Sequence, residues 1–96
     1  MIMAKVKTKL FDAADYLDSP ETINAYLDEA FETGDAAFVA HALGTVARAK
    51  GMAKVARKSK LSRESLYKAL SADGNPEFAT ILKVMNALDL KLVVTG

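Results

Sequence analysis

The stretch GMAKVARKSKLSRESLYKALS, residues 51–71, decides the predicted fold. Apolar residues recur in it three and four positions apart, as they do on one face of a helix. These residues are Met52, Val55 and Ala56 in the first half and Leu66, Ala69 and Leu70 in the second. Ser62 can cap the second helix, because its hydroxyl can accept a hydrogen bond from a backbone N–H of the first turn. The stretch therefore predicts two short helices joined by a tight turn.

Polar side chains fill the outer faces of both predicted helices. They are Lys54, Arg57 and Lys58 in the first helix and Arg63, Glu64, Ser65 and Lys68 in the second. In a DNA-binding helix-turn-helix, the first helix lies against the phosphate backbone and the second presents its first residues to base edges in the major groove. Residues 52–71 fit that arrangement. They also fit a small helical module whose basic face binds protein, so both interpretations stand at this point.

Charge is distributed unevenly along the chain. Residues 1–45 contain three lysines and eight acids, a net charge of −5, whereas residues 46–96 contain ten basic residues and four acids, a net charge of +6. Eight of those basic residues and one acid, Glu64, lie between positions 48 and 68. Such asymmetry suggests a polyanionic partner for the second half and a basic partner for the first.

Length and composition limit the classes of protein. The 96 residues predict one domain over 11–96, preceded by a flexible arm over 1–10, and a second copy would help so small a core. The chain has no cysteine and a single histidine, His41, so we expect no metal and no cofactor. No nucleophile with a base at usable spacing and no glycine-rich phosphate loop is found, and we expect no enzyme. No apolar run resembles a signal peptide or a membrane span, which predicts a cytoplasmic protein without a membrane partner.

Three further helices and a short tail are predicted. Ser19 with Pro20 begins a helix that ends at Gly34, Asp35 caps a helix that runs to Lys50, and a third helix covers 76–88 with Asn75 as its cap. The predicted buried face of the helix after Ser19 consists of Ile23, Tyr26, Leu27, Ala30 and Phe31. That of the helix after Asp35 consists of Phe38, Val39, Ala42, Leu43, Val46 and Ala47. That of the helix over 76–88 consists of Phe78, Ile81, Leu82, Met85 and Leu88.

The two ends of the chain are less regular. The spacing of Phe11, Ala14 and Leu17 suggests one apolar side of a short turn. The tail LKLVVT, residues 90–95, is rich in β-branched residues and favours a short strand. A lone strand needs a partner, so we expect the tail to pair across a dimer axis, with another chain or with the N-terminal arm.

Three segments together resemble a known family. They are FDAADYLDSPETINAYLDEAFETGDAAFVAHALGTVARAKGM, VARKSKLSRESLYKALS and DGNPEFATILKVMNAL, and the resemblance covers residues 11–92. The chain resembles the addiction-module antidote proteins, bacterial antitoxins with an Xre/Cro-type helix-turn-helix. The resemblance implies an all-α, five-helix, lambda-repressor-like domain. It also implies a homodimer that represses its own operon as part of a type II toxin–antitoxin module and neutralises a RelE/ParE-type toxin by direct binding.

The resemblance also assigns residues. Ser62, Arg63, Glu64 and Ser65 match the start of the family's recognition helix, and Lys54 matches the start of the preceding helix, near phosphate. Related sequences commonly have glycine where this chain has Lys60. The lysine therefore either takes a left-handed backbone conformation, at a cost of about 1 kcal/mol, or the turn has another shape.

The side chains suggest separate roles on double-stranded operator DNA. Phosphate contacts are expected from Lys54, Arg57, Lys58 and Lys68, with an affinity that falls with salt. Arg63 is the candidate for a bidentate contact to guanine, and Ser65 for a contact to a base edge or a phosphate. Glu64 either accepts from a cytosine amino group or stabilises the helix N-terminus. Tyr67 is expected to pack at the edge of the helix pair.

The partner of the acidic half has competing interpretations. RelE/ParE-type toxins are generally basic, so residues 12–35 suit a toxin-docking surface by charge. The same residues also suit a solvated face that only keeps the protein soluble. A stand-alone Xre/Cro-type repressor without a toxin partner is the alternative to the antitoxin.

Overall fold

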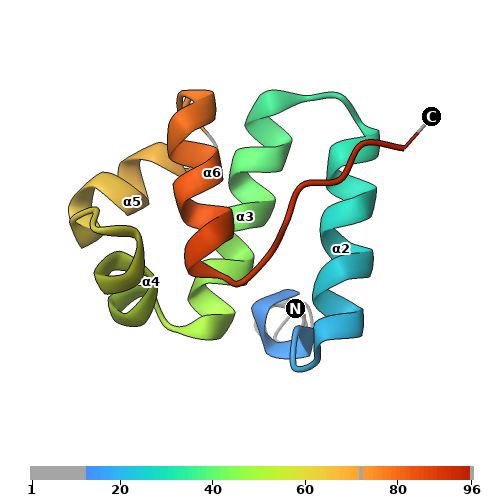
Figure 1. Cartoon of the computed structure of the whole chain (residues 1–96), viewed down its shortest axis with the longest axis horizontal. Helices are drawn as coiled ribbons and strands as arrows, with labels where there is room; N and C mark the ends of the chain where they lie inside the picture. Colours follow the sequence, from blue (N-terminus) through green and yellow to red (C-terminus); the bar gives the residue numbers. More distant parts are fainter. Residues whose placement is uncertain (1–12, 72, 96) are drawn as a thin grey trace, which may run out of the picture.

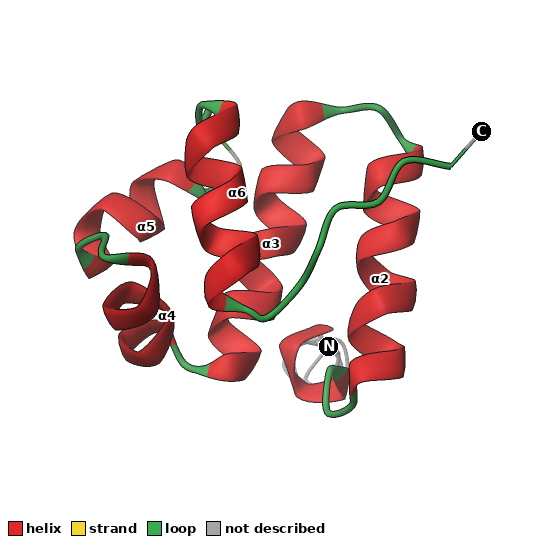
Figure 2. Cartoon of the chain, viewed as in Figure 1, coloured by secondary structure: helices red, strands yellow, loops and turns green. Residues whose placement is uncertain are grey.

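The chain is described over residues 13–71 and 73–95 by a computed structural model, and every regular element in those residues is helical. A 3₁₀ helix and five α-helices follow one another as η1 (Ala13–Tyr16), α2 (Pro20–Glu32), α3 (Ala36–Lys50), α4 (Met52–Ser59), α5 (Arg63–Ala69) and α6 (Phe78–Ala87) (Figure 2). The predicted all-α class with five helices is confirmed. The arm expected over residues 1–10 lies outside the described residues, as does Phe11.

Local capping determines where α2 and α3 begin, as the sequence predicts. The Ser19 hydroxyl accepts from the Thr22 N–H at 3.2 Å, and the Thr22 hydroxyl oxygen accepts from the Ser19 N–H, which completes a capping box. Asp35 accepts from two N–H groups in the first turn of α3. Gly51 separates α3 from α4 with φ of 102°, a conformation that favours glycine. These short-range contacts divide the chain into separate helices.

The core is built around α3, which lies between α2 and the group α4–α6 (Figure 1). The largest fully buried side chains are Leu43, Val46, Val55, Leu66 and Val84. They come from α3, α4, α5 and α6, so one continuous core joins the two predicted helices of residues 52–71 to the rest of the domain. At about 25 cal/mol for each Å² of apolar surface removed from water, this burial is the main term that stabilises the arrangement.

Two parts of the predicted packing are wrong. The last helix begins at Phe78 rather than at position 76, because residues 75–77 are not helical and the Ile81 N–H donates to the Glu77 carbonyl as the first helical bond. Phe38 and Phe78 are 47% and 63% exposed, although both were expected in the core. Each lies in the first turn of its helix, where a side chain leans toward the helix N-terminus and so extends past the packed helices.

The buried face of α6 is also rotated from the expected one. Leu82 is 43% exposed, whereas Val84, which the sequence pattern left out, is fully buried beside Met85. The face toward the core is therefore formed by Ile81, Val84, Met85 and Leu88. Phe78 and Leu82, one turn apart, form a separate exposed stripe.

The tail does not form a strand within the described residues. The Leu90 N–H donates to the Met85 carbonyl at 2.9 Å, after which residues 91–95 run along α2 without regular secondary structure (Figure 2). The partners expected for such a strand, a second chain or the N-terminal arm, lie outside the described residues, so that pairing stays a prediction.

Candidate nucleic-acid interface

The turn between α4 and α5 centres on Lys60, which has φ of 63° and ψ of 24°. This is the left-handed conformation, the first of the two alternatives for the lysine that replaces glycine. The turn is held by Ser59, whose hydroxyl donates to the Ala56 carbonyl at 3.2 Å and accepts from the Leu61 N–H at 3.3 Å. Because Ser59 is buried, these two bonds fix the direction in which the chain leaves α4.

The first turn of α5 is exposed and capped. The Ser62 hydroxyl accepts from the Ser65 N–H at 3.0 Å and donates to the Ser65 hydroxyl at 2.9 Å. Ser62 rather than Glu64 therefore makes the hydrogen-bonded cap, and Glu64 adds a favourable charge near the positive end of the helix. Arg63, Glu64 and Ser65 are all exposed in that turn, one turn before Lys68.

The opposite side of α5 is anchored in the core. Leu66 is fully buried and Leu70 is 4% exposed. A Cβ added to Gly44 of α3 would lie 2.7 Å from the Leu70 carbonyl oxygen, so the glycine permits the close approach of α5 to α3. The exposed first turn of α5 is therefore mounted on a rigid base, which a recognition helix requires.

The basic residues differ in their surroundings. Lys54, Arg57, Arg63 and Lys68 are exposed, and none of them forms an ion pair with another described residue. Lys58 differs, because its Nζ lies 3.3 Å from Oδ2 of Asp89, directly after α6. A phosphate contact from Lys58 would first require this ion pair to open.

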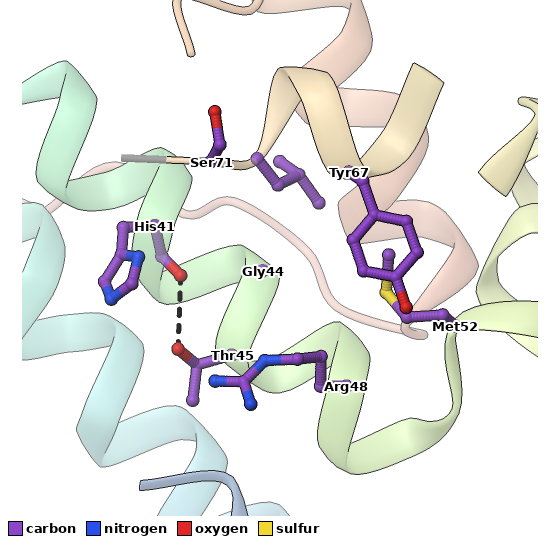
Figure 3. Close-up of a pocket in the computed structure, with 8 residues that line it drawn as sticks. His41, Gly44, Thr45, Arg48, Met52, Tyr67 and Ser71 are labelled. Carbon is purple, nitrogen blue, oxygen red and sulfur yellow. Dashed lines mark hydrogen bonds between the residues drawn. The ribbon is translucent and has the colours of Figure 1, made fainter. Parts of the chain in front are cut away.

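Sequence patterns missed a cavity of about 290 Å³ between α3 and α5. Its lining includes His41, Thr45, Arg48, Met52 and Tyr67. The Tyr67 side chain extends from α5 toward Met52 and Arg48, and the Thr45 hydroxyl donates to the His41 carbonyl at 3.2 Å (Figure 3). Positions 41, 45 and 48 lie on one side of α3 because of their helical spacing, and this spacing is the sequence signal that could have predicted the cavity wall.

Tyr67 is 49% exposed in that cavity wall, in keeping with its expected place at the edge of the helix pair. His41 is exposed at the same wall, beside the end of α5. Among the described residues, no group of three His, Asp or Glu side chains is placed to hold a metal ion. No helix within 13–71 and 73–95 is long and apolar enough to cross a membrane.

Comparisons with known proteins give the family. A family model described as a probable addiction module antidote protein matches residues 7–96. An uncharacterized protein of Haemophilus influenzae is 49% identical over 86 residues, which are 90% of this chain and 89% of that protein. No solved structure matches the chain. From its helices, its sequence and these matches, the chain belongs to the family of probable addiction module antidote proteins.

Proposed function

We propose that this protein is the DNA-binding antitoxin of a type II toxin–antitoxin module. In this proposal α4 and α5 form an Xre/Cro-type helix-turn-helix in a lambda-repressor-like domain that binds the operator of its own operon and represses it. The main support is the exposed, capped first turn of α5, which follows a fixed turn. The exposed Lys54, Arg57, Arg63 and Lys68 on α4 and α5 form no ion pair with another described residue. Family membership favours an antitoxin over a stand-alone repressor.

The protein would then recognise DNA by non-covalent contacts rather than by a chemical reaction. Lys54, Arg57 and Lys68 would contact phosphates, each releasing counterions and steepening the salt dependence of binding. Arg63 would donate two hydrogen bonds to O6 and N7 of a guanine. Because the Ser65 hydroxyl already accepts from Ser62, it remains a donor to a base edge or a phosphate oxygen. Lys58 would join the phosphate contacts once it leaves Asp89.

A homodimer is part of the proposal, because one module reads only a few base pairs and two copies match a palindromic site. The exposed stripe of Phe78 and Leu82 on α6 supports it, since apolar side chains one turn apart suit a second copy of the same helix. Sedimentation equilibrium of Phe78→Ser/Leu82→Ser should give a monomer mass where the wild type gives a dimer. The matched control is Val94→Ser, which removes an exposed apolar side chain elsewhere.

The proposed toxin contact is the acidic outer surface of α2. Asp28, Glu29 and Glu32 are exposed on it, and a basic toxin would complement their charge. Reversing all three to lysine should weaken binding to the toxin encoded beside the chain by at least about tenfold. Reversal of Glu64, Asp73 and Glu77, outside α2, is the control. Unchanged affinity after the α2 reversal would rule out this surface, and the lack of any toxin partner would favour the stand-alone repressor.

The DNA part is tested by fluorescence anisotropy with the chain's own upstream DNA and a scrambled duplex, each at two salt concentrations. Wild type should prefer the upstream DNA. Arg63→Ala should lose that preference by about 1–3 kcal/mol while keeping weak, salt-sensitive binding. Lys83→Ala, an exposed lysine on α6, is the control that should leave the preference intact. If wild type binds both duplexes equally, the helix-turn-helix assignment fails and a protein-binding role for the basic face is favoured.

A further inference from the structure

A groove of about 710 Å³ runs between α2 and the tail. The least exposed residues of its lining are apolar, and they form its floor: Leu27, Phe31, Met85 and Leu90. Its α2 wall includes two exposed carboxylates, Asp28 and Glu32, and the tail adds one exposed lysine, Lys91, so the lining keeps a net negative charge. An occupant that fits this groove therefore needs an apolar side toward the floor and positive charge toward α2.

The other wall of the groove is the tail itself. Residues 91–95 form no hydrogen bond with the rest of the described chain, so their backbone N–H and C=O groups are free to pair. Their apolar side chains are uncovered, with Val93 72% and Val94 93% exposed. An extended segment with free backbone groups and exposed valines is a template for strand addition.

We propose that the groove binds the N-terminal segment of the same chain, residues 4–10, as a strand added to the tail. The sequence there is AKVKTKL, in which lysines at 5, 7 and 9 alternate with Val6, Thr8 and Leu10. Because successive side chains of a strand point to opposite faces, the three lysines share one face and the other four residues, Ala4 included, share the opposite face. The segment matches both requirements of the groove: an apolar face for the floor and three positive charges near Asp28 and Glu32.

Chain length and direction agree with this placement. The described chain begins at η1, beside the N-terminal end of α2, while the tail runs from the end of α6 toward the C-terminal end of α2 (Figure 1). Ten residues in a strand span about 33 Å, more than the roughly 20 Å length of the 13-residue α2. A segment that approaches η1 from the far end of α2 runs antiparallel to the tail, the orientation in which ladder hydrogen bonds are strongest.

Other occupants match the groove less well. The tail of a second copy would bring one lysine, Lys91, to two carboxylates, whereas residues 4–10 bring three. The toxin surface proposed above shares Asp28 and Glu32, so arm and toxin would compete for the same carboxylates. The placement of the arm does not depend on the proposed function, because it is measurable on the isolated protein.

Amide hydrogen exchange of the full-length protein, followed by NMR at two protein concentrations, tests the proposal. Amides within 92–94 should exchange at least about tenfold more slowly than in an unstructured peptide, at both concentrations. Lys5→Glu/Lys7→Glu/Lys9→Glu should remove that protection, and Asp28→Lys/Glu32→Lys in the same chain should restore it. The matched control, Arg57→Glu/Lys68→Glu/Lys83→Glu, reverses three exposed charges away from the groove and should leave it unchanged.

A spin label distinguishes an arm that binds the groove of its own chain from an arm that binds the groove of a second copy. The chain has no cysteine, so Lys7→Cys accepts a single nitroxide. Labelled protein enriched in ¹⁵N should show broadened signals for residues 91–95. Broadening that appears only when a nitroxide-labelled, unenriched protein is mixed with an unlabelled ¹⁵N protein would overturn the proposal in favour of a second copy. Exchange of 92–94 at peptide rates in the wild type would overturn it altogether.

Discussion

The Nζ of Lys58 in α4 lies 3.3 and 3.5 Å from the two carboxylate oxygens of Asp89, which follows α6 and has φ of 61°. Both side chains are partly exposed, at 38% and 82%, so the pair contributes at most about 1 kcal/mol to stability. Its larger effect is on position. The pair directs the side chain of Lys58, one of the candidate phosphate contacts, toward the end of α6.

Asp89→Asn should free Lys58 without disturbing the backbone, since asparagine tolerates the left-handed conformation. We expect an unfolding free energy within about 1 kcal/mol of wild type. We also expect tighter operator binding, with a salt slope steeper by about 1, from one added phosphate contact. Anisotropy titrations over a salt series measure both, with Asp73→Asn as the control for loss of an acid. An unchanged slope would remove Lys58 from the interface.

Lys60→Gly should stabilise the protein. Lysine in the left-handed conformation costs about 1 kcal/mol or more, and glycine adopts it without a Cβ clash. Chemical denaturation should give an unfolding free energy higher by about 0.5–1 kcal/mol. The opposite sign is expected for Lys54→Gly, within α4, where glycine costs about 1 kcal/mol. Loss of stability in Lys60→Gly would mean that the lysine stem contributes packing that outweighs its strain.

Features fixed by neighbouring residues were predictable from sequence. Ser19, Asp35 and Ser62 cap helices because an oxygen and an N–H two or three residues apart decide the bond. The buried faces of α4 and most of α3 follow for the same reason, since helical spacing fixes which residues share a side. The two alternatives for the backbone at Lys60 also followed from the residue at that position alone, and the structure has the left-handed one.

Features that depend on distant parts of the chain were not predictable. Lys58 meets Asp89 across 31 residues, and His41 lines one cavity with Tyr67 because α5 packs on α3. The start of α6 was not predictable from local signals either. Asn75 and Pro76 are good local start signals, but residues 75–77 are not helical and the helix begins at Phe78, after Glu77. The roles of the basic residues on DNA stay predictions, because they depend on a partner.

Gly44→Ala should destabilise the protein by about 1–3 kcal/mol, the usual cost of overpacking. The added Cβ would meet the Leu70 carbonyl oxygen at 2.7 Å and the Leu70 Cβ at 3.2 Å, and backbone cannot yield as a flexible side chain does. Because α5 must move away from α3, operator affinity should fall even where the protein remains folded. Thermal unfolding and anisotropy measure the two effects. Thr45→Ala, which removes a hydroxyl one position along α3, is the control expected to keep α5 in place.

Ser62→Ala removes the oxygen that accepts from the Ser65 N–H and should lower the unfolding free energy by about 0.5–2 kcal/mol. Ser62→Asp restores an acceptor and places negative charge at the helix N-terminus, so it should recover most of that stability. The two variants should differ on DNA, since a carboxylate beside phosphates is repelled while the alanine is neutral. Denaturant titrations measure the effect of each variant on stability through the helix cap, and anisotropy measures its effect on DNA affinity. If Ser62→Asp binds operator as tightly as wild type, the start of α5 lies away from the phosphate backbone, and the proposed docking of the recognition helix is wrong.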